Sequence, residues 1–148
     1  MKYRFAKESD LKEIVDLHYS VREFYPTGFF SKTRKSFLRT YYKILIHDPN
    51  EIVFCAESNG EIRGFCTGSL DVEKQQRLFA KKKIKLGLSL ISTILFNPKF
   101  LLEILNRYSS IQNKSKENKY IIDKGARSEY WTWSKDGDDS EYSVKFYS

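Results

Sequence analysis

The sequence has few residues that form covalent or metal cross-links. It holds two cysteines among 148 residues, Cys55 and Cys66, and neither lies in a CxxC pair or in the Cys/His spacing of a metal site. This pattern excludes a disulfide framework, and we expect no metal centre. Both thiols are expected to be buried in a reducing compartment. His18 and His47 are isolated histidines, which are more often structural than catalytic.

The sequence also shows no pattern typical of a secretory leader or of a membrane-spanning helix. Charges alternate through residues 1–12, with no apolar signal-peptide core and no lipidation motif, so we expect a cytoplasmic protein. The apolar stretch at residues 86–105 is broken by Asn97, Pro98, Lys99 and Glu103, whereas a spanning helix needs roughly 20 uninterrupted apolar residues. We expect an apolar helix pair, buried in the core or in a homodimer interface.

Positive charge is concentrated in one segment. The net charge is +7, and residues 72–127 contain 13 Lys and Arg against 4 Asp and Glu. A solvated helix face explains this charge. Alternatively, an interfacial helix contacts anionic lipid, because cations directly precede the apolar stretch. We do not expect nucleic acid as a partner, since the chain shows no reading motif and no spaced stacking platform. The cations before the apolar stretch are Arg77, Lys81, Lys82, Lys83 and Lys85.

The first half of the chain predicts a strand, two helices and a hairpin. Length and 41% hydrophobic residues suit one domain over residues 1–148. A strand is expected at 2–6, a helix capped by Ser9, and a second helix stopped at Asp48-Pro49. Asn59-Gly60 between two β-forming runs predicts a tight hairpin. The apolar helix faces are Leu11, Ile14, Val15, His18 and Val21, then Phe37, Leu38, Tyr41, Tyr42, Ile44 and Leu45.

The segment at 72–127 is too long for a connection without structure of its own. We therefore expect helices in this segment. Residues 73–83 are charged and favour helix, residues 84–96 are strongly apolar, and a third helix is expected from Pro98 to about Tyr108. Residues 109–128 are expected to form a loop, within which 119–123 could add a short strand. The aromatic, β-branched run at 129–134 predicts the fourth strand.

This order of elements resembles the opening of a GNAT-type N-acetyltransferase. Residues 4–11 (RFAKESDL) resemble the family's R-x-A-x-x-x-D-L opening, and residues 53–65 (VFCAESNGEIRGF) resemble its V-A-E-x-x-G-x-I-V-G-F hairpin. The resemblance implies an α/β fold with a mixed, mainly antiparallel sheet flanked by helices. It places a basic helical insertion, residues 72–127, between the third and fourth strands.

The resemblance also implies an acetyl-CoA site. The fourth strand, with Trp131, Thr132 and Trp133, would pair with the pantetheine arm, and the next loop would bind the pyrophosphate. That loop normally reads Q/R-x-x-G-x-G/A, whereas residues 134–140 read SKDGDDS. Its carboxylates repel a pyrophosphate, so a non-binding turn is an equal alternative to a variant cradle. The cradle residues would be Lys135, Gly137 and Ser140.

Acetyl transfer further needs a base and an acceptor site. By the resemblance, Glu129 would be the catalytic base, and Tyr25, Phe29 and Phe30 would shape the site of a small-molecule amine or amino sugar. Alternatively, Glu129 is a solvated carboxylate at a strand end. The loop with Tyr25, Phe29 and Phe30 would then be a hydrophobic loop packed on the core.

Compared with a complete family member, the chain spans about two thirds to three quarters of the expected length. We therefore expect a homodimer or a partner strand at the open sheet edge. The leading function is an acyl-CoA-dependent N-acyltransferase. The alternative is a non-catalytic scaffold that acts as an interaction or membrane-peripheral module.

Overall fold

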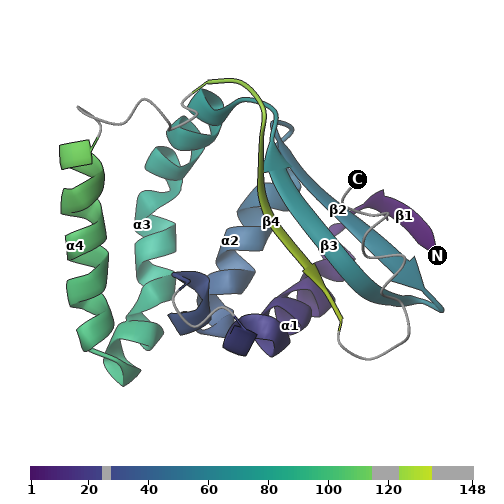
Figure 1. Cartoon of the computed structure of the whole chain (residues 1–148), viewed down its shortest axis with the longest axis horizontal. Coiled ribbons are helices and arrows are strands. Elements are labelled where there is room, and N and C mark those ends of the chain that lie inside the picture. The colour runs from purple at the N-terminus through teal and green to yellow at the C-terminus, as the bar shows by residue number, and fades with distance from the viewer. Residues whose placement is uncertain (25–27, 115–123, 135–148) are drawn as a thin grey trace.

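The computed structural model describes residues 1–24, 28–114 and 124–134. Short 3₁₀ turns at Glu8–Asp10, Arg22–Phe24 and Phe30–Lys32 accompany the main elements. Figure 1 shows the main elements in chain order, which are β1 (Lys2–Phe5), α1 (Leu11–Val21), α2 (Lys35–His47), β2 (Glu51–Ser58), β3 (Glu61–Ser69), α3 (Val72–Phe96), α4 (Lys99–Lys114) and β4 (Arg127–Trp133).

The four strands form one sheet in the order β1-β2-β3-β4, and every neighbouring pair is antiparallel. This confirms an α/β protein with helices and an antiparallel sheet, and it places α3 and α4 between the third and fourth strands. No parallel pair occurs among the described strands. The expected sheet was mixed, which requires at least one parallel strand pair, and such a pair therefore stays a prediction.

The β2–β3 hairpin has the turn that the sequence predicts. Asn59 and Gly60 adopt positive φ angles of 54° and 81°, which a tight hairpin turn requires at both central residues. Ser58 pairs with Glu61 across the turn, and an irregularity follows between Ala56 and Glu57. The local sequence is thus sufficient to set this turn.

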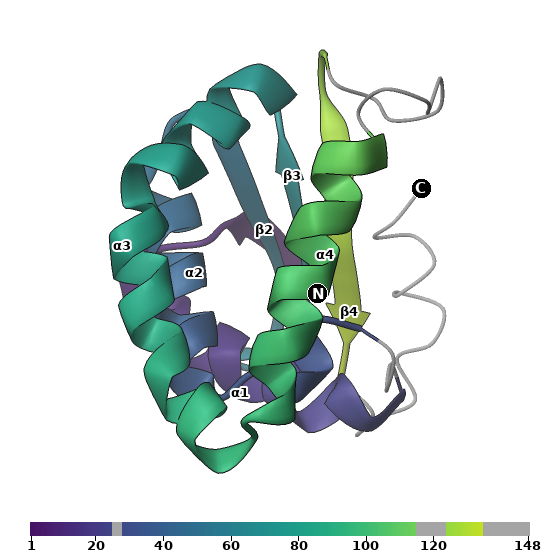
Figure 2. The same cartoon turned by 90° about the vertical axis from the view of Figure 1, so that its left-hand side faces the viewer.

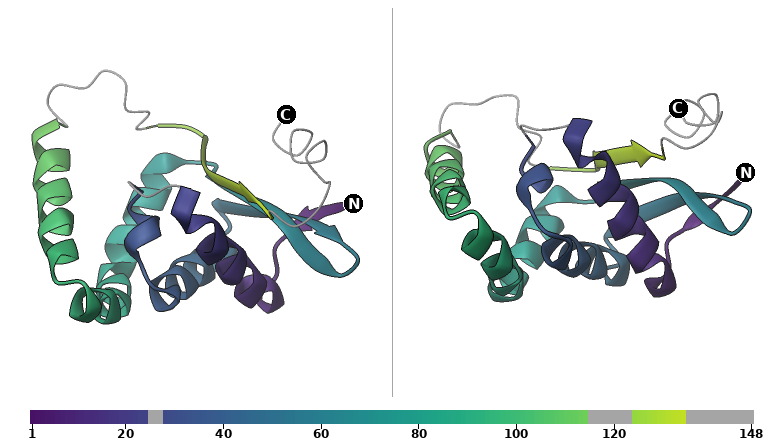
Figure 3. Two further views of the ribbon diagram at one scale, coloured as in Figure 1. Left: turned by 60° about the horizontal axis from the view of Figure 1, so that its bottom comes forward. Right: turned by 90° about the horizontal axis from the view of Figure 1, so that it is seen from below.

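Helices α1 and α2 cover one face of the sheet, α3 packs on α2, and α4 lies outermost beside α3 (Figures 1 and 3). The predicted inward faces of α1 and α2 are confirmed, with Leu11 and Tyr41 only partly buried. The core comprises Ile14, Val15, Phe37, Leu38, Tyr42, Leu45, Val53, Cys55, Ile62 and Phe65.

The predicted cap of the first helix is wrong. Residues Glu8–Asp10 form a 3₁₀ turn, and α1 begins only at Leu11. The Asp10 carboxylate accepts the backbone N–H of Lys7 at 2.7 Å and pairs with Arg4 at 2.5 Å. A carboxylate held by an arginine is a stronger acceptor than a serine hydroxyl, so the turn forms around Asp10 rather than Ser9.

The segment expected as charged and apolar stretches is one continuous helix, α3. Its N-cap is Asp71, whose carboxylate accepts the N–H groups of Glu73 and Lys74. Helix α4 extends to Lys114, beyond the expected end near Tyr108, so the loop predicted from residue 109 begins later. The strand suggested at 119–123 lies outside the described residues. Figure 2 shows α3 and α4 side by side.

Candidate active site

β4 is the last strand of the described sheet, and a bulge in it re-aims Glu129. Ser128 pairs with Gly68 and Tyr130 with Thr67, so Glu129 is an extra residue between the two pairs. Its carboxylate accepts a long hydrogen bond of 3.4 Å from the hydroxyl of Tyr41 on α2. The bulge therefore turns the predicted base toward the helices.

A cavity of about 270 Å³ lies beside this bulge. Three consecutive β4 residues contribute to its wall, and because the bulge interrupts the alternation of side chains, Glu129 and Tyr130 both contact the helices there. It brings together three residues that the sequence singled out: Phe30, Glu129 and Trp131. The described residues that line it are His18, Arg22, Gly28, Phe30, Ser31, Glu129, Tyr130 and Trp131.

His18 and Tyr130 form the aromatic floor of this cavity. Their rings stack with centroids 4.2 Å apart and planes 7° from parallel. Burial lowers the pKa of His18 to about 4, so the imidazole is neutral at pH 7. Its Nδ1 lies 2.5 Å from the hydroxyl of Tyr42, which agrees with the expected structural role for this histidine.

Glu129 belongs to a chain of partly buried polar contacts that joins β4 to α3 and β2. Arg127 donates to Glu129 at 2.7 Å and to the amide oxygen of Gln75 at 3.1 Å. Gln75 in turn donates to Glu51 at 2.7 Å. Burial raises the pKa of Glu51, although Gln75, Asn50 and Ser69 donate hydrogen bonds to it. This network ties the first turn of α3 to β2 and β4.

Sequence reasoning missed this network. Gln75 and Arg127 lie 52 residues apart, and Tyr41 and Glu129 lie 88 apart. Neither pair belongs to a short motif. The only sequence signal is a glutamine at a position that faces the core one turn after the predicted start of a helix, and that signal names no partner.

The other predicted site residues lie elsewhere. Phe29 is not among the described residues that line the cavity, and its ring packs on Phe37 and Phe100 at 5.7 and 5.4 Å between centroids. Thr132 is buried opposite Phe65. The ring of Trp133 covers Gly64 on β3. Tyr25, Lys135, Gly137 and Ser140 lie outside the described residues, so the predicted pyrophosphate cradle stays a prediction.

The cysteines are free thiols, as expected. Cys55 is buried, and burial raises its pKa to about 12. Cys66 is only half-buried, so the expected burial holds for one of the two. Among the described residues, no three His, Cys, Asp or Glu side chains gather in a way that could hold a metal ion.

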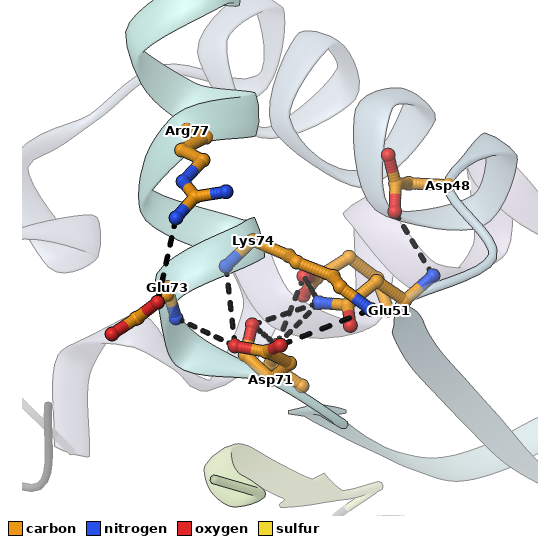
Figure 4. Close-up of polar contacts among 8 residues, drawn as sticks. Asp48, Glu51, Asp71, Glu73, Lys74 and Arg77 are labelled. Carbon is orange, nitrogen blue, oxygen red and sulfur yellow. Dashed lines mark hydrogen bonds and ion pairs between the residues drawn. The ribbon is translucent and has the colours of Figure 1, made fainter. Parts of the chain in front are cut away.

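A second hollow, of about 690 Å³, lies at the start of α3 and away from Glu129. Lys74, Arg77 and Lys81 line it together with Asp48 and Asp71. Figure 4 shows Lys74 directed at Asp71, 3.8 Å away, and Arg77 directed at Glu73, 3.4 Å away. These acids offset part of the positive charge at this end of the helix.

None of the described helices is both long enough and apolar enough to cross a membrane. Comparisons of the chain with protein-family models, with curated proteins and with solved structures found no match.

Proposed function

We propose that the protein is an acyl-CoA-dependent N-acyltransferase that acts on a small amine. One observation carries the proposal: the bulge at Glu129 directs a carboxylate to a cavity beside β4, which is an edge strand of the described sheet. No strand pairs with that edge among the described residues. An unpaired edge offers backbone N–H and C=O groups to an extended ligand such as a pantetheine arm. The resemblance to GNAT proteins supports the same assignment.

The reaction needs a base beside the amine that receives the acetyl group. The amine nitrogen attacks the thioester carbonyl, a C–N bond forms, the C–S bond breaks and CoA leaves as the thiol. Glu129 accepts the proton that the attacking neutral amine loses and returns it to the sulfur of the departing CoA, which supplies the proton of the thiol. Tyr41 keeps its own proton, because burial and the neighbouring Glu129 raise its pKa, and it holds the carboxylate as a donor. Arg127 holds the other oxygen.

The cavity favours a small cationic acceptor. Phe30 and Tyr130 supply flat apolar walls, and Glu129 supplies a carboxylate for an ammonium group or an amino sugar. Arg22, which also lines the cavity, offers a contact for a polar substituent. The homodimer, the cytoplasmic location and the absence of a metal stay predictions.

Calorimetric titration of acetyl-CoA and CoA, followed by thiol release with a panel of small amines, tests the proposal. We expect saturable binding that Lys135→Ala weakens. Glu129→Gln should bind acetyl-CoA normally but turn over about 10²- to 10⁴-fold more slowly, the usual contribution of a positioned base. Glu61→Gln, an exposed change of the same kind at the hairpin, should leave turnover unaltered.

The contrary result is equally informative. No binding at millimolar acetyl-CoA would favour the non-catalytic scaffold. Binding with equal turnover of the wild type and Glu129→Gln would remove Glu129 from the mechanism while leaving the cofactor assignment intact.

A further inference from the structure

One stripe of α3 faces away from the core over most of the helix. Successive members are three or four residues apart, so they lie on one side of the helix. Its apolar members are exposed: Ile84 by 72%, Leu88 by 62%, Ile91 by 48% and Leu95 by 76%. From the N-terminal end, the stripe consists of Arg77, Lys81, Ile84, Leu88, Ile91 and Leu95. The stripe is thus cationic in its first part and apolar in its second.

This exposed stripe is not the side of α3 that builds the core. Phe79, Leu86 and Leu90 pack against the core, and Thr93 is buried. The second half of α3 is therefore apolar on two sides, and only one side is covered. A helix that is apolar all round is normally buried on every side. Burial in the core, one of the two expected alternatives for this helix pair, accounts for one side of α3, and the homodimer interface stays a prediction.

Helix α4 enlarges the uncovered apolar surface. It lies beside α3 in Figures 1 and 2, and Leu101, Leu102 and Leu105 are exposed on it. Phe96, at the turn between the helices, is exposed by 77%. Apolar side chains of both helices thus reach solvent, and exposed apolar surface of this extent marks an interaction site.

Cations border this apolar region at its N-terminal end. Lys81, Lys82, Lys83 and Lys85 are exposed, and none forms an ion pair with a described carboxylate. Lys81, Lys82 and Lys85 also line a hollow of about 370 Å³ together with Lys43 and His47 of α2. Glu8 pairs with both Lys43 and His47, and Asp48 is the acid in the lining. The hollow therefore keeps a positive excess.

We propose that this surface of α3 and α4 docks on an anionic phospholipid bilayer. The lysines lie at the level of the lipid phosphates, and the apolar part of the stripe enters the boundary between headgroups and acyl chains. A second copy of the chain fits less well, because the sequence of α3 offers a single acid, Glu73, against the lysines. Nucleic acid also fits less well, because its charged backbone would not cover the exposed leucines. Charge complementarity thus selects the lipid surface.

Co-sedimentation with vesicles tests the docking. One vesicle preparation contains equal amounts of phosphatidylcholine and phosphatidylglycerol, and the other contains phosphatidylcholine alone. We expect binding to the anionic vesicles that weakens as salt rises, since salt screens exposed charges. Lys81→Gln with Lys85→Gln, two exposed lysines four residues apart, should lower the affinity by about 30-fold, at about fivefold for each lysine. Lys2→Gln with Lys12→Gln, exposed lysines elsewhere, should leave affinity almost unaltered.

The apolar part needs a separate pair of variants. Leu88→Gln with Leu95→Gln preserves helix propensity and should lower vesicle affinity by at least about tenfold. Phe5→Gln, at an exposed apolar residue of β1, is the control. Circular dichroism of each variant confirms that it is folded.

Three results would overturn the proposal. The wild type stays in the supernatant with anionic vesicles at low salt. The leucine variants bind as well as the wild type, which shows a general polyanion contact without insertion. Or sedimentation velocity shows a dimer that Leu88→Gln with Leu95→Gln dissociates while vesicles are not bound, which assigns the surface to a second copy.

Discussion

The hydroxyl of Tyr42 lies 2.5 Å from Nδ1 of His18, and both side chains are buried. Burial raises the pKa of Tyr42, so the phenol keeps its proton and needs an acceptor. Nδ1 is the acceptor within reach among the described side chains. The neutral imidazole therefore carries its own proton on Nε2.

This pair predicts a loss of stability on mild acidification. The folded-state pKa of His18 is about 4, below the ordinary value of 6.5, so between these values the unfolded chain binds a proton that the folded chain does not. The free energy of unfolding should fall as pH drops through this window, by roughly 3 kcal/mol in total from this group. Urea unfolding at a series of pH values measures the slope.

His18→Gln isolates this contribution, because glutamine still offers Tyr42 an acceptor and does not titrate. We expect a flatter pH profile for the variant. The raised pKa of Glu51 has the opposite effect, since it makes the folded chain more stable as pH falls. This effect is present in the wild type and in His18→Gln alike. NMR titration of His18 in the wild type gives an independent check, and a pKa near 6.5 would refute the assignment.

Gln75 bridges two charged groups in a buried position, and it should be intolerant of an apolar replacement. Gln75→Leu fills a similar volume but leaves Glu51 and Arg127 each without one hydrogen-bond partner. We expect a loss of about 2 to 5 kcal/mol in the free energy of unfolding. The neighbouring Gln76 is exposed, and Gln76→Leu should change stability little. Equal effects of the two substitutions would argue against the buried network.

Two glycines predict stability changes of opposite sign. A Cβ at Gly64 would overlap the six-membered ring of Trp133, so Gly64→Ala should cost about 1 to 3 kcal/mol and alter tryptophan fluorescence. At Gly87, within α3, nothing lies near the added Cβ, so Gly87→Ala should stabilise by about 0.8 to 1 kcal/mol. Chemical denaturation of both variants compares them. A stabilised Gly64→Ala would mean that Trp133 does not cover this glycine.

Asp71 should be the main local determinant of where α3 begins. Its carboxylate accepts the backbone N–H groups of Glu73 and Lys74 at 3.0 and 3.3 Å. Asp71→Ala should lower the free energy of unfolding by about 1 kcal/mol, whereas Asp71→Ser should retain most of the cap. Thermal unfolding followed at 222 nm checks the order wild type, serine, alanine. An alanine variant as stable as the serine variant would contradict the capping role.

Local patterns predicted the parts of the fold that depend on neighbours in sequence. Asn59-Gly60 specifies its own turn, and the spacing of Ile14, Val15 and His18 specifies the buried face of α1. The predicted start of α1 is wrong because Arg4, on a separate strand, pairs with the Asp10 carboxylate and holds the 3₁₀ turn that precedes the helix. A contact of that kind has no local signal.

The candidate site was predictable only in part, for the same reason. Glu129 and Phe30 could be named from their places in the order of elements, but the bulge that aims Glu129 depends on its pairing with β3. The two apolar sides of α3 have the same helical period. Sequence spacing therefore cannot tell the side that packs on the core from the side that is left uncovered.

The pairing of Ser69 with Arg127 joins strand ends that are separated by all of α3 and α4. Closing so long a loop is slow, while the β2–β3 hairpin and its covering helices form from contacts that are closer in sequence. β4 should therefore join the sheet late in folding and detach early on unfolding. Under increasing denaturant, the cavity beside Glu129 would then be lost before most of the helical signal is.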